Sequence, residues 1–324
     1  MNTETTFQAN ARSKFKKFYA QHTYVFSFIG LIIIAAVINK NFLTYANLST
    51  LMLQSAIKGV IALGMTLIII SGQIDLSVGS ITALVAGLGV VVLNTTGSIF
   101  LMLIFCIIFG AILGLINGLL VTKGRIAAFI VTLATLSAYR SIIVQLGQGG
   151  PFNVGENVYK SFRLIAAGTF LKIPNLAIIF VIITIIIALI MDKTKFGRYV
   201  YAVGSNENAA RLSGVNVNKI KTMCFAITGL LTGISAFLLS SRLTSITAPN
   251  AGVSFELDAI AAVAIGGTSM NGGRGRIVGT FLGIIMLQMI EGILIAAKIP
   301  PFLTGLVKGI IIILAVLLQS KKER

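Results

Sequence analysis

Residues 99–121 read IFLMLIFCIIFGAILGLINGLLV, a run without one charged side chain. A helix needs about 20 apolar residues to cross the hydrocarbon core of a bilayer, so this run is predicted to span a membrane. The whole chain has the same character, since 56% of its 324 residues are apolar and 11% are charged. Soluble domains carry about 25% charged residues. This composition excludes a soluble enzyme, a disordered regulator and a secreted disulfide scaffold.

Similar apolar runs recur along the chain and predict an all-α polytopic membrane protein with about ten transmembrane helices. The predicted spans are residues 22–38, 49–70, 78–93, 99–121, 126–146, 174–191, 222–241, 257–268, 277–297 and 302–318. Residues 257–268 would extend only about 18 Å as a helix. There we expect a short crossing or a broken helix that the surrounding protein shields from lipid.

The predicted organisation is one membrane domain with basic tails. Its parts are a cytoplasmic N-tail at 1–21, a single transmembrane domain at 22–318 with a cytoplasmic loop at 192–221, and a cytoplasmic C-tail at 319–324. The net charge of +17 reflects 26 basic and 9 acidic residues. Because the basic residues gather at the ends of predicted spans, we interpret them as orientation signals and expect no nucleic-acid partner. If both termini lie in the cytoplasm and all ten spans cross, most of the basic residues fall on the cytoplasmic side.

A weak internal repeat relates the two halves of the chain. Asp75 precedes a short span in the first half, and Asp258 opens another in the second. Each is followed by a helix rich in small residues, which ends near Asn117-Gly118 or Glu291-Gly292. The units are five predicted spans apart, so they face opposite ways, as in inverted-repeat transporters. The two aspartates either cap helices or contact solute along a pathway.

Glycines four residues apart are expected to pack helices closely, or else to form a subunit interface. They are Gly110/Gly114/Gly118, Gly229/Gly233, Gly279/Gly283 and Gly305/Gly309.

Residues for catalysis are scarce. Nine acidic residues and the single His22, placed at a membrane boundary, are too few for a conventional catalytic group, and the chain has no P-loop for ATP. Cys106 and Cys224 lie in apolar stretches and are interpreted as packing residues. The glycines and arginines of 272–276 are interpreted as a cytoplasmic turn. We therefore expect a protein that is not an enzyme and holds neither cofactor nor metal.

The loop 192–221 is predicted to contain a short helix. Ser205 is positioned to cap it, Glu207 lies in its first turn, and Gly214 follows its end. Such a helix between two spans is either a docking element for a cytosolic partner or an ordinary surface helix.

Six stretches together resemble the permease subunits of ribose-type carbohydrate ABC importers over nearly the whole chain. They are GQIDLSVGS at 72–80, NGLLV at 117–121 with FIVTLAT at 129–135, FGRY at 196–199, AARLSG at 209–214, ELDAIAA at 256–262 and GGTS at 266–269. Gln73 stands where the family signature has a glycine.

The resemblance implies a multi-pass protein of the bacterial plasma (inner) membrane. It further implies a cytosolic ATP-binding subunit, an extracytoplasmic solute-binding protein and a second permease copy. The 205–214 helix becomes the coupling helix that contacts the ATPase. The residues that match its EAA-x-x-x-G pattern, with Asn208 intervening and without the I-x-L-P ending, are Glu207, Ala209, Ala210 and Gly214, and Arg211 lies among them.

The sequence leaves alternatives open for both the substrate and the mechanism. A monosaccharide such as ribose is expected, while nucleosides, inositol, galactose-type sugars or a quorum signal are alternatives within the superfamily. Polar side chains that are candidates for a pathway or its gates are Asp75, Asn117, Asp258 and Glu291, with Gln145 and Gln288 as further hydroxyl partners. An ion-coupled secondary transporter would use Asp75, Asp258 or Glu291 for its ion. A channel or scaffold would need no ATPase.

Overall fold

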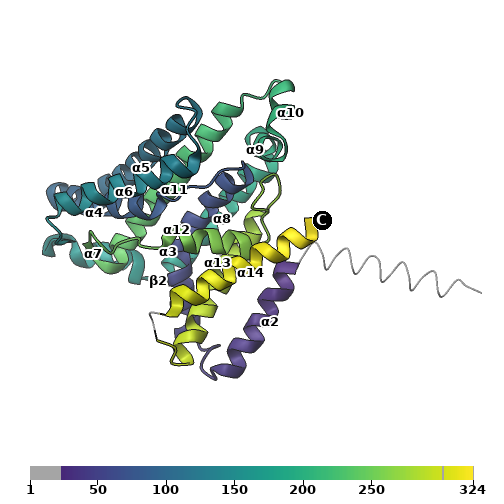
Figure 1. Ribbon diagram of the computed structural model, residues 1–324. Coiled ribbons are helices and arrows are strands. Elements are labelled where there is room, and N and C mark those ends of the chain that lie inside the picture. Colours follow the sequence, from purple (N-terminus) through teal and green to yellow (C-terminus); the bar gives the residue numbers. More distant parts are fainter. Residues whose placement is uncertain (1–22, 301–302, 324) are drawn as a thin grey trace, which may run out of the picture.

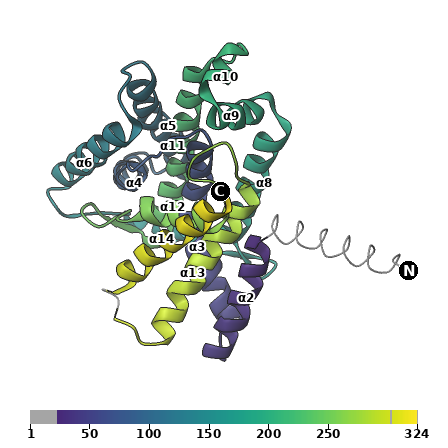
Figure 2. The ribbon, with the colours of Figure 1, turned by 45° about the vertical axis from the view of Figure 1, so that its right-hand side comes forward.

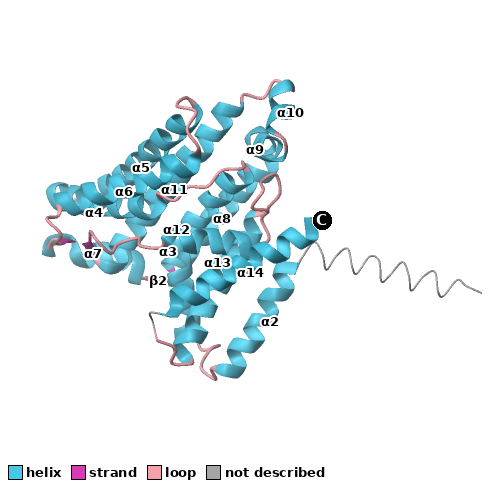
Figure 3. Cartoon of the chain, in the orientation of Figure 1, coloured by secondary structure: helices cyan, strands magenta, loops and turns pink. Residues whose placement is uncertain are grey.

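The computed structural model describes residues 23–300 and 303–323, and within them the chain is almost entirely helical (Figure 3). The helices are α2 (Thr23–Ile38), α3 (Tyr45–Ile70), α4 (Val78–Thr96), α5 (Ile99–Thr122), α6 (Ala128–Leu146), α7 (Glu156–Ala167), α8 (Asn175–Lys193), α9 (Lys195–Ser205), α10 (Glu207–Leu212), α11 (Val217–Leu243), α12 (Phe255–Ile265), α13 (Ile277–Ala296) and α14 (Thr304–Glu323). Four short strands form two antiparallel pairs, β1 (Pro151–Asn153) with β4 (Ser245–Thr247) and β2 (Thr169–Phe170) with β3 (Ile173–Pro174).

Each predicted span overlaps a helix. In the described part of the chain, seven helices are long and apolar enough to cross a membrane, namely α3, α4, α5, α6, α8, α11 and α13. Helix α2 is apolar but has only 16 residues. Helix α12 has 11 residues, which is the short segment expected at 257–268. It is enclosed by α3, α4, α13 and α14, so its short length does not expose its ends to lipid.

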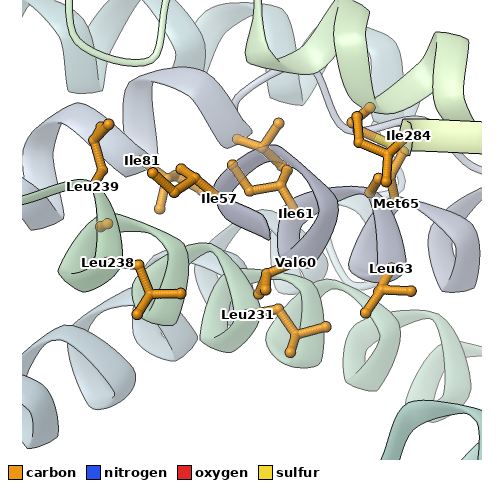
Figure 4. Close-up of a cluster of buried hydrophobic side chains, with 14 of the residues drawn as sticks. Ile57, Val60, Ile61, Leu63, Met65, Ile81, Leu231, Leu238, Leu239 and Ile284 are labelled. Atoms are coloured by element: carbon orange, nitrogen blue, oxygen red, sulfur yellow. The ribbon is translucent and has the colours of Figure 1, made fainter. Parts of the chain in front are cut away.

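Helix α3 forms the centre of the core. It packs against α8, α11, α12 and α13, and almost every side chain from Ser55 to Ile70 is buried. Figure 4 shows residues of α3 in contact with neighbouring helices, drawn with Ile57, Val60, Ile61, Leu63 and Met65 of α3, Ile81 of α4, Leu231, Leu238 and Leu239 of α11, and Ile284 of α13.

Glycines allow α5 and α11 to cross at backbone distance. A Cβ added to Gly110 would collide with the carbonyl oxygen of Gly229, and one added to Gly229 would collide with that of Gly110. The predicted close packing is confirmed for these glycines. It is wrong within the described chain for Gly305 and Gly309, because a Cβ at either position meets nothing within 4 Å. Among the described residues, nothing therefore packs closely on α14 at these two glycines.

The helices form two groups that meet along α3 and α11 (Figures 1 and 2). In one group α4 packs against α5 and α6, and in the other α12 packs against α13 and α14. Helix α11 packs against α4 and α5 of the first group, and α3 packs against α12 and α13 of the second.

Two small assemblies lie at opposite ends of the bundle. At one end, β1, α7, β2 and β3 lie in the chain between α6 and α8, and β4, which pairs with β1, follows α11. At the other, α9 and α10 join the end of α8 to the start of α11, and Figure 1 shows α10 projecting from the bundle. The sequence interpretation contained α10 within the loop 192–221 but did not predict α7.

Candidate functional site

A buried polar network joins three helices of the first group. Asp75 lies between α3 and α4 and is 1% exposed. Its Oδ1 accepts hydrogen bonds from the backbone N–H of Ser77 at 2.8 Å and from the Ser77 hydroxyl at 2.6 Å. Ser77 Oγ in turn accepts from Asn117 Nδ2 on α5 at 2.8 Å, and the Tyr139 hydroxyl on α6 donates to Asn117 Oδ1 at 3.3 Å. Asp75 therefore binds Ser77, the residue before α4, and through Ser77 connects to Asn117, while no side chain caps the first turn of α4.

A second cluster joins four helices by ion pairs. Asp258 on α12 binds Lys58 of α3 through Oδ2 at 2.7 Å and Lys308 of α14 through Oδ1 at 2.6 Å. Glu291 on α13 binds both lysines through Oε1, with Lys58 at 3.4 Å. We call Lys58, Asp258, Glu291 and Lys308 the ionic cluster.

Asp258 lies in the first turn of α12, where its charge complements the helix dipole, but it makes no capping hydrogen bond. Both of its carboxylate oxygens are held by lysines, and the N-cap of α12 is Ser254, whose side chain makes no capping hydrogen bond. A carboxylate that neutralises two ammonium groups at membrane depth gains more from those charges than from a helix end.

The candidate pathway residues thus form two separate pairs. Asp75 and Asn117 share the network of the first group, whereas Asp258 and Glu291 share the ionic cluster of the second. Of the two further candidates, Gln145 is exposed and Gln288 is 2% exposed with neither amide atom hydrogen-bonded among the described residues.

Lys58 and Lys308 were located within predicted spans, but the sequence did not assign them a role. Their positive charge inside predicted spans could have indicated an ion pair, because a lysine within a membrane span is usually paired with a carboxylate.

Helix α10 is a short, capped element held by charges. Asn206 Oδ1 accepts from the backbone N–H of Ala209 at 2.9 Å, so the cap is Asn206. The expectation for Ser205 is wrong because this residue completes the last turn of α9. Both residue types cap helices well, so the sequence could not separate neighbouring positions.

Glu207 connects α10 to α11. Its Oε1 binds Arg211 at 2.9 Å and its Oε2 binds Lys221 of α11 at 2.7 Å. The hydrogen bond from Lys221 lowers the pKa of Glu207, with further contributions from the charges of Lys221 and Arg211, against the effect of partial burial. Glu207 is therefore ionised at neutral pH. The junction of α10 with α11 pairs its negative charge with the positive charge of Lys221.

The outward face of α10 is open. Leu212 is 90% exposed, and Arg211 is also exposed. Beside the helix lies an open groove of about 970 Å³. It is lined by residues of α10, of the turn from α10 to α11, of the start of α11, and of the α3–α4 and α5–α6 loops, including Gln73, Arg125, Glu207, Arg211, Gly214 and Lys221. Gly214 turns the chain between α10 and α11 with a φ of +82°, a conformation that other residues adopt only at a cost.

The segment before α10 contacts the end of α3. A Cβ at Gly204 would collide with the carbonyl oxygen of Ile70, the last residue of α3. The same carbonyl accepts a hydrogen bond from the backbone N–H of Gly273 at 2.8 Å. The Tyr201 hydroxyl on α9 donates to the carbonyl of Gly275 at 3.0 Å. The predicted turn at 272–276 is thus the point where α9 meets α3 and the α12–α13 connection.

A bundle of long apolar helices with charged side chains paired inside it defines a multi-pass membrane protein of the transport class. The comparison with known families is specific: the family described as branched-chain amino acid transport system / permease component matches residues 47–316. The chain belongs to this permease family.

Several curated proteins are similar over most of the chain. The ribose import permease protein RbsC of Bacillus subtilis is 44% identical over 91% of this chain and 92% of its own length. That of Haemophilus influenzae is 39% identical over the same shares. The L-arabinose transport system permease protein AraH of Escherichia coli is 33% identical over 96% of this chain and 93% of its own. No solved structure matches the chain.

Proposed function

We propose that this chain is the membrane-spanning permease subunit of an ABC importer for a monosaccharide such as ribose. The observation that carries the proposal is the high identity to ribose import permeases along almost the full chain. Identity to the L-arabinose permease is lower, which favours ribose among the pentoses. Because the chain has no P-loop, ATP hydrolysis resides in a separate cytosolic subunit, and the chain itself is not an enzyme.

The proposed topology is ten crossings with both termini in the cytoplasm of a bacterial cell and an inverted repeat of α3–α6 with α11–α14. The packing supports this repeat, since α3 contacts α12 and α13 as α11 contacts α4 and α5. Asn117 and Glu291 also lie at similar distances from the ends of α5 and α13. Inverted repeats place a pathway between the two groups.

The proposed coupling element is α10 with its following turn, formed by Glu207, Ala209, Ala210, Arg211 and Gly214. Its exposed face contacts the ATP-binding subunit. Motion of that subunit passes to α11 through the bond of Glu207 to Lys221, and to α3 through the contact of Gly204 with Ile70. An extracytoplasmic binding protein delivers the sugar, and a second copy of the chain completes the pathway.

The proposed gates are the two polar clusters. The network of Asp75 and Asn117 joins α4, α5 and α6 toward the α10 end, and the ionic cluster joins α12, α13 and α14 toward the opposite end. Polar contacts between helices are worth a few kcal/mol at most, so they break and reform during a transport cycle.

The alternative of an ion-coupled transporter is less well supported. It requires an intramembrane carboxylate that is available for an ion. Asp258 and Glu291 are each held by two lysines, so a coupling cation would first have to displace a bound ammonium group. The third candidate, Asp75, binds Ser77 through Oδ1, and its Oδ2 has no hydrogen-bond partner among the described residues.

Uptake by reconstituted vesicles tests the proposal. The chain is assembled with the ATP-binding subunit and binding protein of its importer, ATP is enclosed in the vesicles, and labelled ribose is added outside. We expect accumulation that requires ATP and continues when ionophores collapse all ion gradients. Accumulation that follows an ion gradient without ATP would overturn the proposal.

A further inference from the structure

We propose that the ionic cluster is a solute-contact site that binds adjacent hydroxyl groups of a neutral polyhydroxylated solute. This inference rests on the proposed function, because it places the solute of that importer at particular side chains. It assigns to Lys58, Asp258, Glu291 and Lys308 a role beyond joining helices.

The position of the cluster favours contact with water. Lys58 lies 12 residues before the end of α3, about 18 Å along that helix, and so well inside the apolar span that α3 forms. Lys58, Glu291 and Lys308 are nevertheless 19%, 17% and 16% exposed. Charged side chains that remain partly open at this depth face an aqueous cavity or protein, because exposure to lipid is too costly. The cluster therefore borders a pathway or an interface between copies.

The hydrogen-bonding capacity of the cluster is only partly used. A lysine ammonium group has three donors, and each lysine uses two of them on Asp258 and Glu291. Glu291 makes all its described contacts through Oε1, so Oε2 has no partner among the described residues. One N–H donor on each lysine and the Oε2 acceptor of Glu291 therefore remain without a partner among the described residues.

This remaining set matches the chemistry of a sugar. Adjacent hydroxyl groups each donate one hydrogen bond and accept another, so a diol can donate to Glu291 Oε2 while accepting from both ammonium groups. The cluster has no net charge, which suits a neutral solute better than an anion or a cation. Hydrogen bonds to charged groups are also stronger than neutral ones, so the contact compensates for lost hydration.

Two neighbouring side chains support this ligand class. The ring of Phe255 lies 5.8 Å from Lys58 Nζ and is partly exposed, which provides an apolar surface beside the cluster. Gln288 lies three residues before Glu291 on α13, so both fall on one side of the helix. Its buried amide lacks a described partner and offers one more donor and acceptor.

Cysteine reporters next to the cluster test this site in the assembled importer. Gly292 adjoins Glu291 and Gly309 adjoins Lys308, and a Cβ at either position meets nothing within 4 Å, so Gly292→Cys and Gly309→Cys fit the fold. Leu171→Cys, at an 81% exposed position in the β2–β3 turn, serves as the remote control. The native Cys106 and Cys224 are buried and stay in place. The probe is a charged, membrane-impermeant thiol reagent, applied with and without ribose.

We expect the reagent to modify Gly292→Cys, Gly309→Cys and Leu171→Cys, and ribose to slow the first two reactions but not the third. Combining Gly292→Cys with Glu291→Gln should raise the ribose concentration for half protection about tenfold, because one hydrogen bond to a charged group is lost. Combining it with Glu156→Gln, an exposed change on α7, should leave that concentration unchanged.

Failure to modify either cysteine, or modification that ribose does not slow, would overturn the site. Ribose uptake by the same vesicles separates this result from failure of the proposed function. If uptake continues without protection, only the solute-contact site is wrong. If half protection of Gly292→Cys needs the same ribose concentration with and without Glu291→Gln, this result would also contradict the solute-contact site.

Discussion

Lys221 donates a 2.7 Å hydrogen bond to Glu207, and this bond joins the exposed helix α10 to the long helix α11. The Lys221 side chain is 13% exposed and that of Glu207 is 40% exposed, so the pair lies where α10 meets the bundle. In the proposed function, force applied to α10 reaches the membrane helices at this bond.

Glu207→Lys should abolish most ribose uptake while the protein still inserts. The substitution places a third cation beside Arg211 and Lys221, so α10 is repelled from α11 instead of being held. The measurement is uptake, together with the amount of ATP-binding subunit that co-purifies. Glu156→Lys on α7 makes the same change of charge far from α10 and should transport normally. Normal uptake by Glu207→Lys would contradict the coupling role.

The pH dependence follows from the pKa of Glu207. Because Lys221 lowers this pKa, the carboxylate contributes stability above its ordinary pKa, and this contribution disappears as the pH falls through the lowered value. Glu207 stays ionised between about pH 5 and pH 8, so its titration should not change the amount of ATP-binding subunit that co-purifies in this range. In Glu207→Gln the amount should be lower and equally constant. A wild-type decline centred near pH 6 that Glu207→Gln removes would contradict the stated direction.

Gly214→Val should reduce uptake strongly. At a φ of +82° a side chain is strained by about 1–2 kcal/mol, and a branched one most of all. Space is not the reason, because a Cβ at Gly214 meets nothing within 4 Å. Gly214→Asn, which tolerates this conformation better, should retain more uptake. Equal activity of the two variants would show that the turn needs no left-handed residue.

Asn117→Leu should destabilise the protein in detergent by about 1–3 kcal/mol. The change leaves the buried hydroxyls of Ser77 and Tyr139 without the amide that joins them. Thermal unfolding of the purified chain measures the effect. The matched change Gln145→Leu, at an exposed position of α6, should have little effect. An unchanged midpoint for Asn117→Leu would mean that the network does not hold α4, α5 and α6 together.

Lys308→Met should lower the unfolding midpoint more than the double change Lys308→Met with Asp258→Asn. The single change leaves two carboxylates to share Lys58, at a cost of about 2 kcal/mol or more, whereas the double change restores neutrality. If the double variant is the less stable of the two, the ion pairs are not what holds α14 to α12.

The sequence predicted the positions of the membrane helices because each is a long apolar run. Residues 99–121, for example, correspond to α5 at Ile99–Thr122. Helix α7 was missed because Glu156, Lys160 and Arg163 interrupt its apolar residues. A 12-residue segment of mixed polarity resembles a loop when the sequence is searched for long apolar runs.

Pairing between distant residues was not accessible from the sequence. Lys58 and Glu291 are separated by 233 positions, and nothing local indicates that they meet. Asp75 and Asp258 look alike in the sequence, yet one binds a helix start and the other binds two lysines. The packing of the surrounding helices determines which role each carboxylate takes.

Modification of Leu212 tests most directly whether α10 couples the chain to an ATP-binding subunit. Leu212→Cys places a thiol on the most exposed side of α10, and Leu171→Cys does the same in the β2–β3 turn at the other end of the molecule. Both variants are treated with a bulky maleimide from the side each faces, and ATP-driven ribose uptake is measured. The account predicts that uptake stops and the ATP-binding subunit dissociates when Leu212→Cys is modified, while modified Leu171→Cys keeps its subunit. Full ATP-driven uptake with Leu212→Cys completely modified would contradict it.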